Sequence, residues 1–225
     1  MEALDVDLWL LTEAHLDVAL EGQVIHHSEP RHIKPKQRWS AISSRWPIKP
    51  LPSSHIGLAL ARVAHPDGSL LTACSVMPWR GARGSWPGDP SAKHSDRFAE
   101  SLRDHAAAIS RARGGSEAVV WGGDFNQALA GRETAGSLAG RALLLSVFDD
   151  LGLTALTGNL GHRIEGIMSI DHVAAPRHWV AMDARRVMPK ADSGKPLSDH
   201  ATYVVETAPA RVGAEDQDRS AHSPQ

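Results

Sequence analysis

Short, nearly continuous apolar runs constrain this chain more than any other feature of its sequence. The clearest runs are 7–12 (DLWLLT), 56–64 (IGLALARVA), 69–77 (SLLTACSVM) and 117–121 (EAVVW). Runs of this kind are typical of strands that are buried on both faces. A buried strand needs cover on each side, so we expect two sheets packed together with helices outside them.

Two segments between strands predict helices. The segment 92–113 has apolar residues at helical spacing, with charged residues between them: Phe98, Leu102, Ala106 and Ile109. The segment 137–152 offers Ser137 as an N-cap and Gly152 just past its end. The sequence HPDG, which separates two of the apolar runs, predicts a hairpin. Further strand candidates are 39–44, 167–175 and 201–207.

The composition bounds the size and the partners of the protein. The 225 residues are 42% hydrophobic and 22% charged, which suffices for a domain with a substantial core. The formal net charge of −2 argues against a general polyanion binder, although it is compatible with a local basic patch. The one cysteine, Cys74, excludes an intrachain disulfide framework.

The two ends of the chain suggest a location and a domain boundary. The acidic N-terminus lacks the basic region of a signal peptide, and no apolar run reaches the roughly 20 residues that span a bilayer. We therefore expect a cytoplasmic protein that has no membrane partner and is monomeric by default. One domain is expected over 1–207, followed by a polar, disordered tail over 208–225.

The segment WGGDFNQ (121–127) places polar residues directly after an apolar strand candidate. In an extended segment, residues two apart point to the same side, so Asp124 and Asn126 should converge. The two glycines before them allow a close backbone approach or an unusual turn. Hard oxygen ligands of this kind suit Mg²⁺ or Mn²⁺.

Three other acidic residues are ambiguous when each is taken alone. Glu13 in LLTEAH is either a functional carboxylate or an ordinary solvated strand end. Asp171 in SIDHV interrupts an apolar segment, where a buried carboxylate needs a partner or a cation. Asp199 in LSDHA could belong to a site, or could merely bond the local backbone of a turn.

Taken together, the motifs resemble the endonuclease/exonuclease/phosphatase superfamily. The resemblance depends on five motifs in order, from residue 7 to about 206: LLTEAH, SSRWPI, GGDFN, SIDHV and LSDHA. It implies an α+β fold, a four-layered α/β/β/α sandwich in which two mixed β-sheets pack face to face with helices outside. It also implies hydrolysis of a phosphate ester by directly attacking water, with Mg²⁺ or Mn²⁺ as the cofactor.

The resemblance also implies roles for individual residues. Asp124 would orient or deprotonate the attacking water, and Asn126 would bind a phosphate oxygen. His200 would contact the scissile phosphate, and Asp171 would hold the tautomer of His200. For the metal, the resemblance implies that Glu13 is a ligand and that Asp199 lies beside the metal site.

The chain departs from the family pattern at two places. The usual first strand, which carries an asparagine, is apparently missing, because Glu13 lies so near Met1. The start of the sequence is then misassigned or truncated, or this lineage lacks the strand. Second, the segment Met77–Arg80 stands where many members have a histidine or tyrosine. Either the leaving group departs without a general acid, or Arg80 supplies charge; alternatively Arg80 simply faces solvent.

The Gly- and Pro-rich loop 78–91 contains Trp79, Arg80, Arg83 and Trp86. Its aromatic and basic residues could stack a base and hold a phosphate, which makes Arg80 and Trp79 candidates for substrate binding. Alternatively, the tryptophans pack the loop onto the body. The favoured function is a nuclease-type phosphodiesterase, so nucleic acid is a candidate partner. The alternatives are a small-molecule phosphatase of the same superfamily and a non-catalytic binding module that kept the fold.

Overall fold

A six-stranded mixed sheet forms the centre of the computed structural model, which describes residues 4–31, 34–82, 86–191 and 193–209. In spatial order its strands are β4 (Ile48–Leu51), β5 (Leu58–His65), β6 (Gly68–Val76), β7 (Ala118–Asp124), β9 (Asp171–Pro176) and β8 (Leu153–Ala155). The central pair, β6 and β7, is parallel, and the other neighbours are antiparallel. The hairpin predicted around HPDG is confirmed as β5 and β6.

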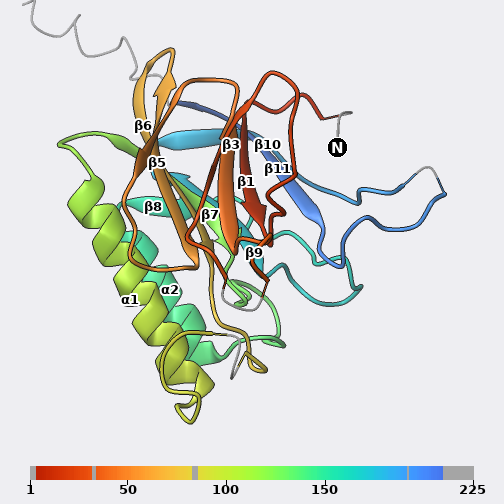
Figure 1. Ribbon diagram of the computed structural model, residues 1–225. Helices are drawn as coiled ribbons and strands as arrows, with labels where there is room; N and C mark the ends of the chain where they lie inside the picture. The colour runs from red at the N-terminus through yellow and green to blue at the C-terminus, as the bar shows by residue number, and fades with distance from the viewer. Residues whose placement is uncertain (1–3, 32–33, 83–85, 192, 210–225) are drawn as a thin grey trace, which may run out of the picture.

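Two helices cover one face of this sheet. α1 (His94–Ala112) crosses over from β6 to β7, and α2 (Leu138–Asp150) follows β7 (Figure 1). The predicted N-cap of α2 is confirmed, because the Ser137 hydroxyl accepts a bond of 3.0 Å from the amide of Gly140. The main hydrophobic core lies between helices and sheet and includes Leu71, Leu102, Trp121, Phe125 and Phe148. None of the described helices is long and apolar enough to cross a bilayer.

A smaller antiparallel sheet packs on the opposite face. Its order is β1 (Leu8–Thr12), β3 (Ser40–Ser44) and β2 (Val24–His27). Alternate residues of its strands point inward, so that Leu8, Leu10 and Ile42 pack against β5 and β6. A two-stranded ribbon of β10 (Trp179–Val187) and β11 (Thr202–Pro209) lies beside β1 (Figure 1).

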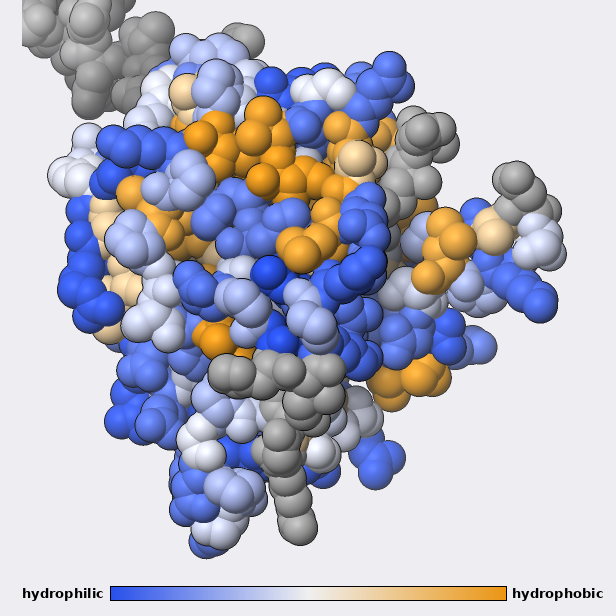
Figure 2. Space-filling view, in the orientation of Figure 1, coloured by the Kyte–Doolittle hydropathy of each residue, from blue (hydrophilic) through white to orange (hydrophobic). Residues whose placement is uncertain are grey.

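The predicted α+β sandwich of two packed sheets is confirmed, with two differences in detail. The small sheet and the ribbon are purely antiparallel, so only the six-stranded sheet is mixed. Both described helices lie on the same side, so within the described ranges no helix covers the outer face of the small sheet. Figure 2 shows apolar side chains gathered on the face where β1 and β3 lie in Figure 1.

Four strands were not anticipated from the sequence: β2, β4, β8 and β10. β4 contains Pro50 and lies at the edge of its sheet, where a missing amide is tolerated. β8 is only three residues long. β11 reaches Pro209, two residues past the expected domain boundary, and the rest of the predicted tail, 210–225, lies outside the described residues.

A groove of about 880 Å³ separates β1 from β11. Among the described residues, β1 pairs only with β3, and β11 pairs only with β10, so each strand presents an unpaired edge. Apolar side chains of the central sheet, Val120, Val173 and Ala175, line the groove. Glu13, Asp171 and His200 also line it. The groove therefore leads to the residues that the sequence motifs single out.

Candidate active site

Asp171 and His200 form a hydrogen-bonded ion pair. Asp171 is the first residue of β9, and His200 stands just before β11. The Nδ1 atom of His200 lies 3.0 Å from each carboxylate oxygen of Asp171. Because Nδ1 donates to the carboxylate, Nε2 is the ring nitrogen left for a substrate. The structure thus brings together the pair that the resemblance implies, although Asp171 begins its strand rather than interrupting one.

Asp124 and Asn126 also converge, but not for the reason expected from strand alternation. β7 ends at Asp124, and Asn126 has a left-handed backbone with φ of 49°. The amide N–H of Asn126 donates to Asp124 Oδ1 at 2.8 Å, and its side-chain Nδ2 donates to Oδ2 at 3.0 Å. A turn closed by the Asp124 side chain therefore produces the convergence.

The second hydrogen of Asn126 Nδ2 is engaged as well, by the carbonyl oxygen of Met77 at 2.9 Å. An amide group has two N–H donors, so both are in use. The predicted bond from Asn126 to a phosphate oxygen therefore requires that one of these bonds be released. In this geometry Oδ1 is the polar atom of Asn126 that stays free among the described residues.

The glycines before Asp124 are required by close backbone contacts. Gly123 has φ of 130°, and a Cβ atom there would lie 2.0 Å from the carbonyl oxygen of Ser75. A Cβ atom on Gly122 would lie 2.7 Å from the carbonyl oxygen of His172. The backbones of β6 and β9 thus lie too close to β7 for a side chain at either position. The close approach expected from the sequence is confirmed.

The site concentrates negative charge in a buried position. Asp124 is only 9% exposed. Burial first, and then the nearby charge of Asp171, raise the pKa of Asp124 to about 8. The hydrogen bond that His200 donates to Asp171 raises the pKa of His200 to about 9, so its imidazolium form prevails at neutral pH. Each pKa shift arises from the site itself, as expected where charged groups are gathered for chemistry.

The donor set fits a hard divalent cation. Asp124, Asp171 and His200 each place a side-chain atom within 4.8 Å of the others, and the two carboxylates are the hard donors, because a protonated His200 ring offers no lone pair. Two carboxylates sharing one buried site repel each other, and a cation between them would relieve that repulsion. Burial, and after it the charge of Asp171, raises the pKa of Asp124, and a bound cation would oppose both effects.

The two residues predicted to bind metal lie outside this cluster. The Glu13 side chain is 55% exposed and lies 3.8 Å from Nη1 of Arg31. Arg31 in turn stacks on Trp39, with its guanidinium carbon 3.3 Å from the ring centroid. Glu13 nevertheless contributes to the field at Asp124. Asp199 is exposed, and its charge acts on His200.

The segment Met77–Arg80 packs against the site rather than opening into it. Trp79 is half-buried, and its ring centroid lies 5.5 Å from that of Trp39. Trp86 packs on Trp39 from another direction, at 5.2 Å. The packing interpretation of these tryptophans agrees with this cluster. Arg83 lies outside the described residues, and Arg80 donates to the carbonyl oxygen of Gly136.

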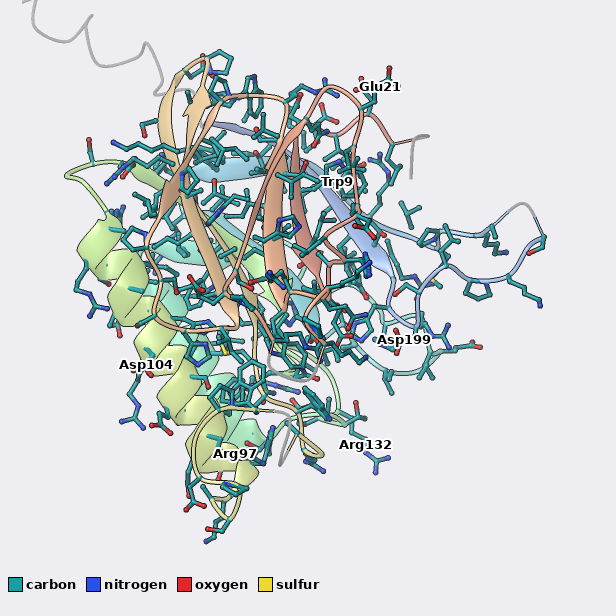
Figure 3. All side chains as sticks on the ribbon, in the orientation of Figure 1. Trp9, Glu21, Arg97, Asp104, Arg132 and Asp199 are labelled. Carbon is teal, nitrogen blue, oxygen red and sulfur yellow. The ribbon has the colours of Figure 1, made fainter. Side chains whose placement is uncertain are left out.

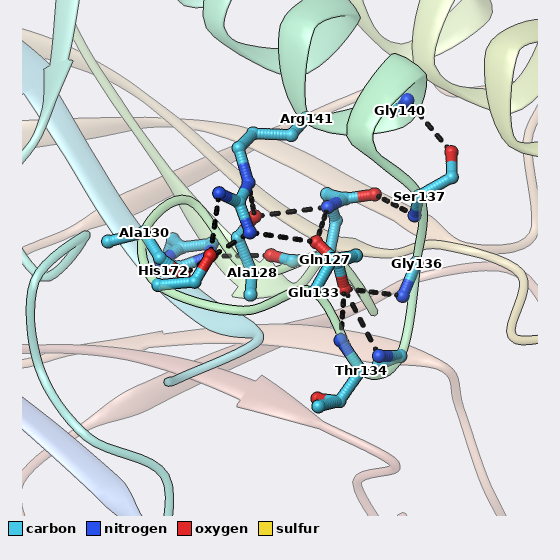
Figure 4. A network of polar contacts seen from close by, with 12 residues as sticks. Gln127, Ala128, Ala130, Glu133, Thr134, Gly136, Ser137, Gly140, Arg141 and His172 are labelled. Carbon is cyan, nitrogen blue, oxygen red and sulfur yellow. Dashed lines mark hydrogen bonds and ion pairs between the residues drawn. The ribbon is translucent and has the colours of Figure 1, made fainter. Parts of the chain in front are cut away.

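A polar network braces the loop that follows Asn126 (Figure 4). Buried Gln127 accepts a bond from the amide of Ser137 at 3.0 Å and donates to Glu133. One oxygen of Glu133 accepts three backbone amides, and the other accepts from Arg141 at 3.3 Å. The loop is thereby fastened to the start of α2. Because Arg80 bonds the same loop, the network also holds the Met77–Arg80 segment.

Comparison with known families identifies the architecture that holds this site. The model of the Endonuclease/Exonuclease/phosphatase family matches residues 1–200. The chain belongs to this family. The resemblance stated from the five motifs is therefore confirmed, and the matched range includes Glu13, Asp124, Asp171 and His200.

Solved structures with the family fold are similar over most of the chain. The endonuclease domain of TRAS1, a telomere-specific non-LTR retrotransposon, is 15% identical with a TM-score of 0.61, over 92% of this chain and 86% of that one. An AP endonuclease from Archaeoglobus fulgidus is 14% identical, also with a TM-score of 0.61, over 89% and 88%. The 3′-5′ exonuclease NExo from Neisseria meningitidis is 18% identical with a TM-score of 0.54, over 89% of each chain. These identities establish the fold alone, and no curated protein matches the chain by sequence.

This family member has two further residues at the site that sequence reasoning did not single out. The His162 ring stands nearly perpendicular to that of His200, with centroids 6.0 Å apart. Burial first, and then the charge of His200, lower the pKa of His162. The Ser169 hydroxyl accepts the amide of Asp171 at 3.0 Å and donates to the Asp171 carbonyl at 2.7 Å. Ser169 lies within the SIDHV motif, whereas His162 lies in a loop with no motif around it.

Proposed function

We propose that the protein is a divalent-cation-dependent phosphoesterase that hydrolyses a phosphate ester by direct attack of water. The observation that carries this proposal is the convergence of Asp124, Asp171 and His200, of which Asp171 and His200 line the groove. Membership of the Endonuclease/Exonuclease/phosphatase family supports the reaction class. The required cation would be Mg²⁺ or Mn²⁺, because the carboxylate donors are hard oxygens.

His200 is assigned to the phosphate. With Nδ1 held by Asp171, its protonated ring can donate through Nε2 to a phosphate oxygen. Negative charge builds on the phosphoryl oxygens in the transition state, so this bond strengthens as the reaction proceeds. Asp171 is then a positioning residue, because it acts by holding and charging the ring of His200.

Asp124 is assigned to the attacking water. Its two oxygens are oriented by Asn126, and each oxygen keeps a further lone pair for another donor. A carboxylate in this position can orient the water and accept its proton, provided that it is ionised. Because the pKa of Asp124 is raised to about 8, it carries a proton near neutral pH until positive charge is brought to the site.

When bound, the cation would supply Lewis acidity and neutralise developing charge. Asp124 would hold it from the cluster, and Glu13 would join Asp124 if its side chain turned away from Arg31. The exposure of Glu13 leaves its side chain free to move. The assignment of Glu13 to the cation, like that of Asp199, is therefore part of the proposal.

Hydrolysis of a panel of substrates tests the proposed function. We would assay single- and double-stranded DNA, RNA, bis-p-nitrophenyl phosphate, inositol phosphates and sphingomyelin, with Mg²⁺ and with Mn²⁺. Asp124→Asn is the control, since it keeps the shape of the side chain and removes the base. Turnover by the wild-type protein that the variant lacks supports the proposal. No turnover on any substrate, or equal turnover by the variant, would instead favour a binding module.

A further inference from the structure

A second cavity, of about 500 Å³, lies at the N-terminus of α1. Four of its lining residues carry basic side chains: Arg80, Lys93, His94 and Arg97. The described residues that line it include no carboxylate. We name these four residues the α1 anion site. The net charge of the whole chain is −2, so this cluster of basic residues is a local positive region on a slightly negative protein.

Arg97 is a buried cation with unpaired donor atoms. It is only 4% exposed, and no described residue accepts a hydrogen bond from its Nε or Nη1 atom. Figure 3 shows Arg97 in the first turn of α1. Burying a guanidinium without an acceptor is costly, so an anion is expected as its counterpart. Asp89 is near enough to feel the charge of Arg97, but its Oδ1 already accepts two bonds from Ser91, at 2.8 and 2.7 Å.

The helix end adds a second, independent attraction for an anion. α1 has 19 residues, and its N-cap, Lys93, provides no side-chain hydrogen bond. The first amide groups of the helix, at His94 and Ser95, donate to no described residue. Free amides and the positive end of the helix dipole together favour a phosphate group at this position.

A short segment links this cavity to the catalytic residues. Asn126 of the catalytic cluster donates to the carbonyl of Met77, and the next carbonyl along the chain, that of Pro78, bonds Nε2 of His94 at 3.0 Å. Consecutive carbonyl groups of one buried segment thus contact both sites, so the two sites are neighbours in the structure.

We propose that the α1 anion site binds a second phosphate group of the same substrate, one that lies along the chain from the phosphate being hydrolysed. This inference rests on the proposed function and narrows its substrate class to a polyanion with spaced phosphates, as in single-stranded nucleic acid. Arg97 would form a bidentate bond with the phosphate, for which the planar guanidinium is suited. Lys93 and the free amides of α1 would complete the site.

The test is the binding of a fluorescein-labelled oligothymidylate 12-mer to protein carrying Asp124→Asn, which separates binding from turnover. Affinity would be measured between 50 and 200 mM salt for this parent and for the parent with Lys93→Gln. Lys49→Gln is the matched control, because Lys49 is an exposed lysine on the edge strand β4. Loss of one phosphate contact should reduce the slope of log K against log salt by about 0.7 in Lys93→Gln and leave it as in the parent in Lys49→Gln.

Arg97→Lys provides a second variant that keeps the charge and removes the planar fork. We expect it to weaken binding by roughly tenfold, with thermal unfolding measured alongside to confirm the fold. Equal slopes for Lys93→Gln and Lys49→Gln would overturn the anion site, whatever the turnover assays show. Inorganic phosphate that binds tightly by calorimetry, lost in Lys93→Gln without any change in oligothymidylate binding, would make the ligand free phosphate and overturn the proposal. If the salt slope falls in Lys93→Gln and not in Lys49→Gln, but no substrate is turned over, the anion site is supported and the proposed function is overturned.

Discussion

The Nδ1 proton of His200 is shared between the two carboxylate oxygens of Asp171, each 3.0 Å away. The ring therefore has a fixed orientation and a carboxylate that stabilises its positive charge. The two residues are 29 positions apart in the sequence: Asp171 begins β9, and His200 lies just before β11. This contact links the first residue of β9 to the segment before β11 at the candidate active site.

His200→Ala should lower kcat by about 10²–10³ and change KM much less, because the lost bond strengthens in the transition state. Asp171→Asn should produce part of that loss. The activity of the wild-type protein should fall as pH rises through about 9, where His200 loses its proton. In Asp171→Asn this fall should move toward the ordinary histidine range near 6.5. Steady-state kinetics across pH measure both effects, and an unaltered profile in Asp171→Asn would rule out the pair as a catalytic unit.

Glu13→Ala should weaken Mg²⁺ or Mn²⁺ binding and leave the fold intact, because Glu13 is an exposed carboxylate whose charge acts on Asp124. Arg31→Gln should have the opposite effect on cation affinity, since it releases Glu13 from its ion pair. Titration calorimetry compares the two variants with wild type. A cation affinity that is the same in all three proteins would remove Glu13 from the ligand set.

Asp124→Asn should stabilise the cation-free protein while it abolishes turnover. The pKa of Asp124 is raised from its ordinary value of 3.8 to about 8, so the folded wild-type protein loses stability as pH rises through that window. The gain in the variant should therefore be small near pH 4 and largest above pH 8, at about 1–2 kcal/mol or a few degrees in Tm. Thermal melts with chelator, beside the exposed-site control Asp17→Asn, test this. A variant that melts below wild type at pH 8 would contradict it.

The buried histidine His105 should make the protein sensitive to acid. It is fully buried. Its Nδ1 atom lies 2.9 Å from Ser75 Oγ, and its Nε2 atom lies 2.7 Å from His55 Nδ1. Burial lowers the pKa of His105 well below 6.5, so the unfolded chain binds its proton more readily. The stability contribution is complete above pH 6.5 and is lost as pH falls below it. Denaturant unfolding measures the free energy of unfolding between pH 7 and 4.5. The slope of that free energy against pH should be smaller by the equivalent of about one proton in His105→Phe and unchanged in His178→Gln.

Gly123→Ala should destabilise the protein by more than about 3 kcal/mol, because the new Cβ atom meets the Ser75 carbonyl. Gly68 is a matched control, since its φ of 133° is close to the 130° of Gly123 while nothing lies within 4 Å of a Cβ atom there. Gly68→Ala should cost only the backbone strain of about 1–2 kcal/mol. Chemical denaturation of both variants isolates the contact, and equal losses would show that the crowding at Gly123 is relieved without cost.

Local chemistry made much of the fold predictable. The hairpin of β5 and β6 follows from its HPDG turn, and the start of α2 follows from the cap at Ser137. The Gly-Gly pair correctly indicated close packing before Asp124. In contrast, the alternating and partly charged β10 is stabilised by its pairing with β11, which no local pattern reveals.

The sequence motifs name residues that the structure brings together, but they do not give the geometry of the site. Asp124, Asp171 and His200 do meet, as the family resemblance implied. Asn126 uses its second donor on the Met77 carbonyl, which is 49 positions away in the sequence. Glu13 lies beside Arg31 because of the three-dimensional fold, which the spacing of the two residues does not reveal. The α1 anion site likewise depends on three-dimensional packing, because the burial of Arg97 on a charged helix face cannot be foreseen from its spacing.

The unpaired edges of β1 and β11 bear on how the protein behaves in concentrated solution. An exposed strand edge is a template on which another chain can add a strand, and charged residues usually guard against this. The five residues of β1, Leu-Trp-Leu-Leu-Thr, include no charge. Pairing between the edge strands of two molecules is therefore the route by which the protein would self-associate. A short peptide with alternating apolar residues, added as a strand between β1 and β11, would occupy both edges and prevent that pairing.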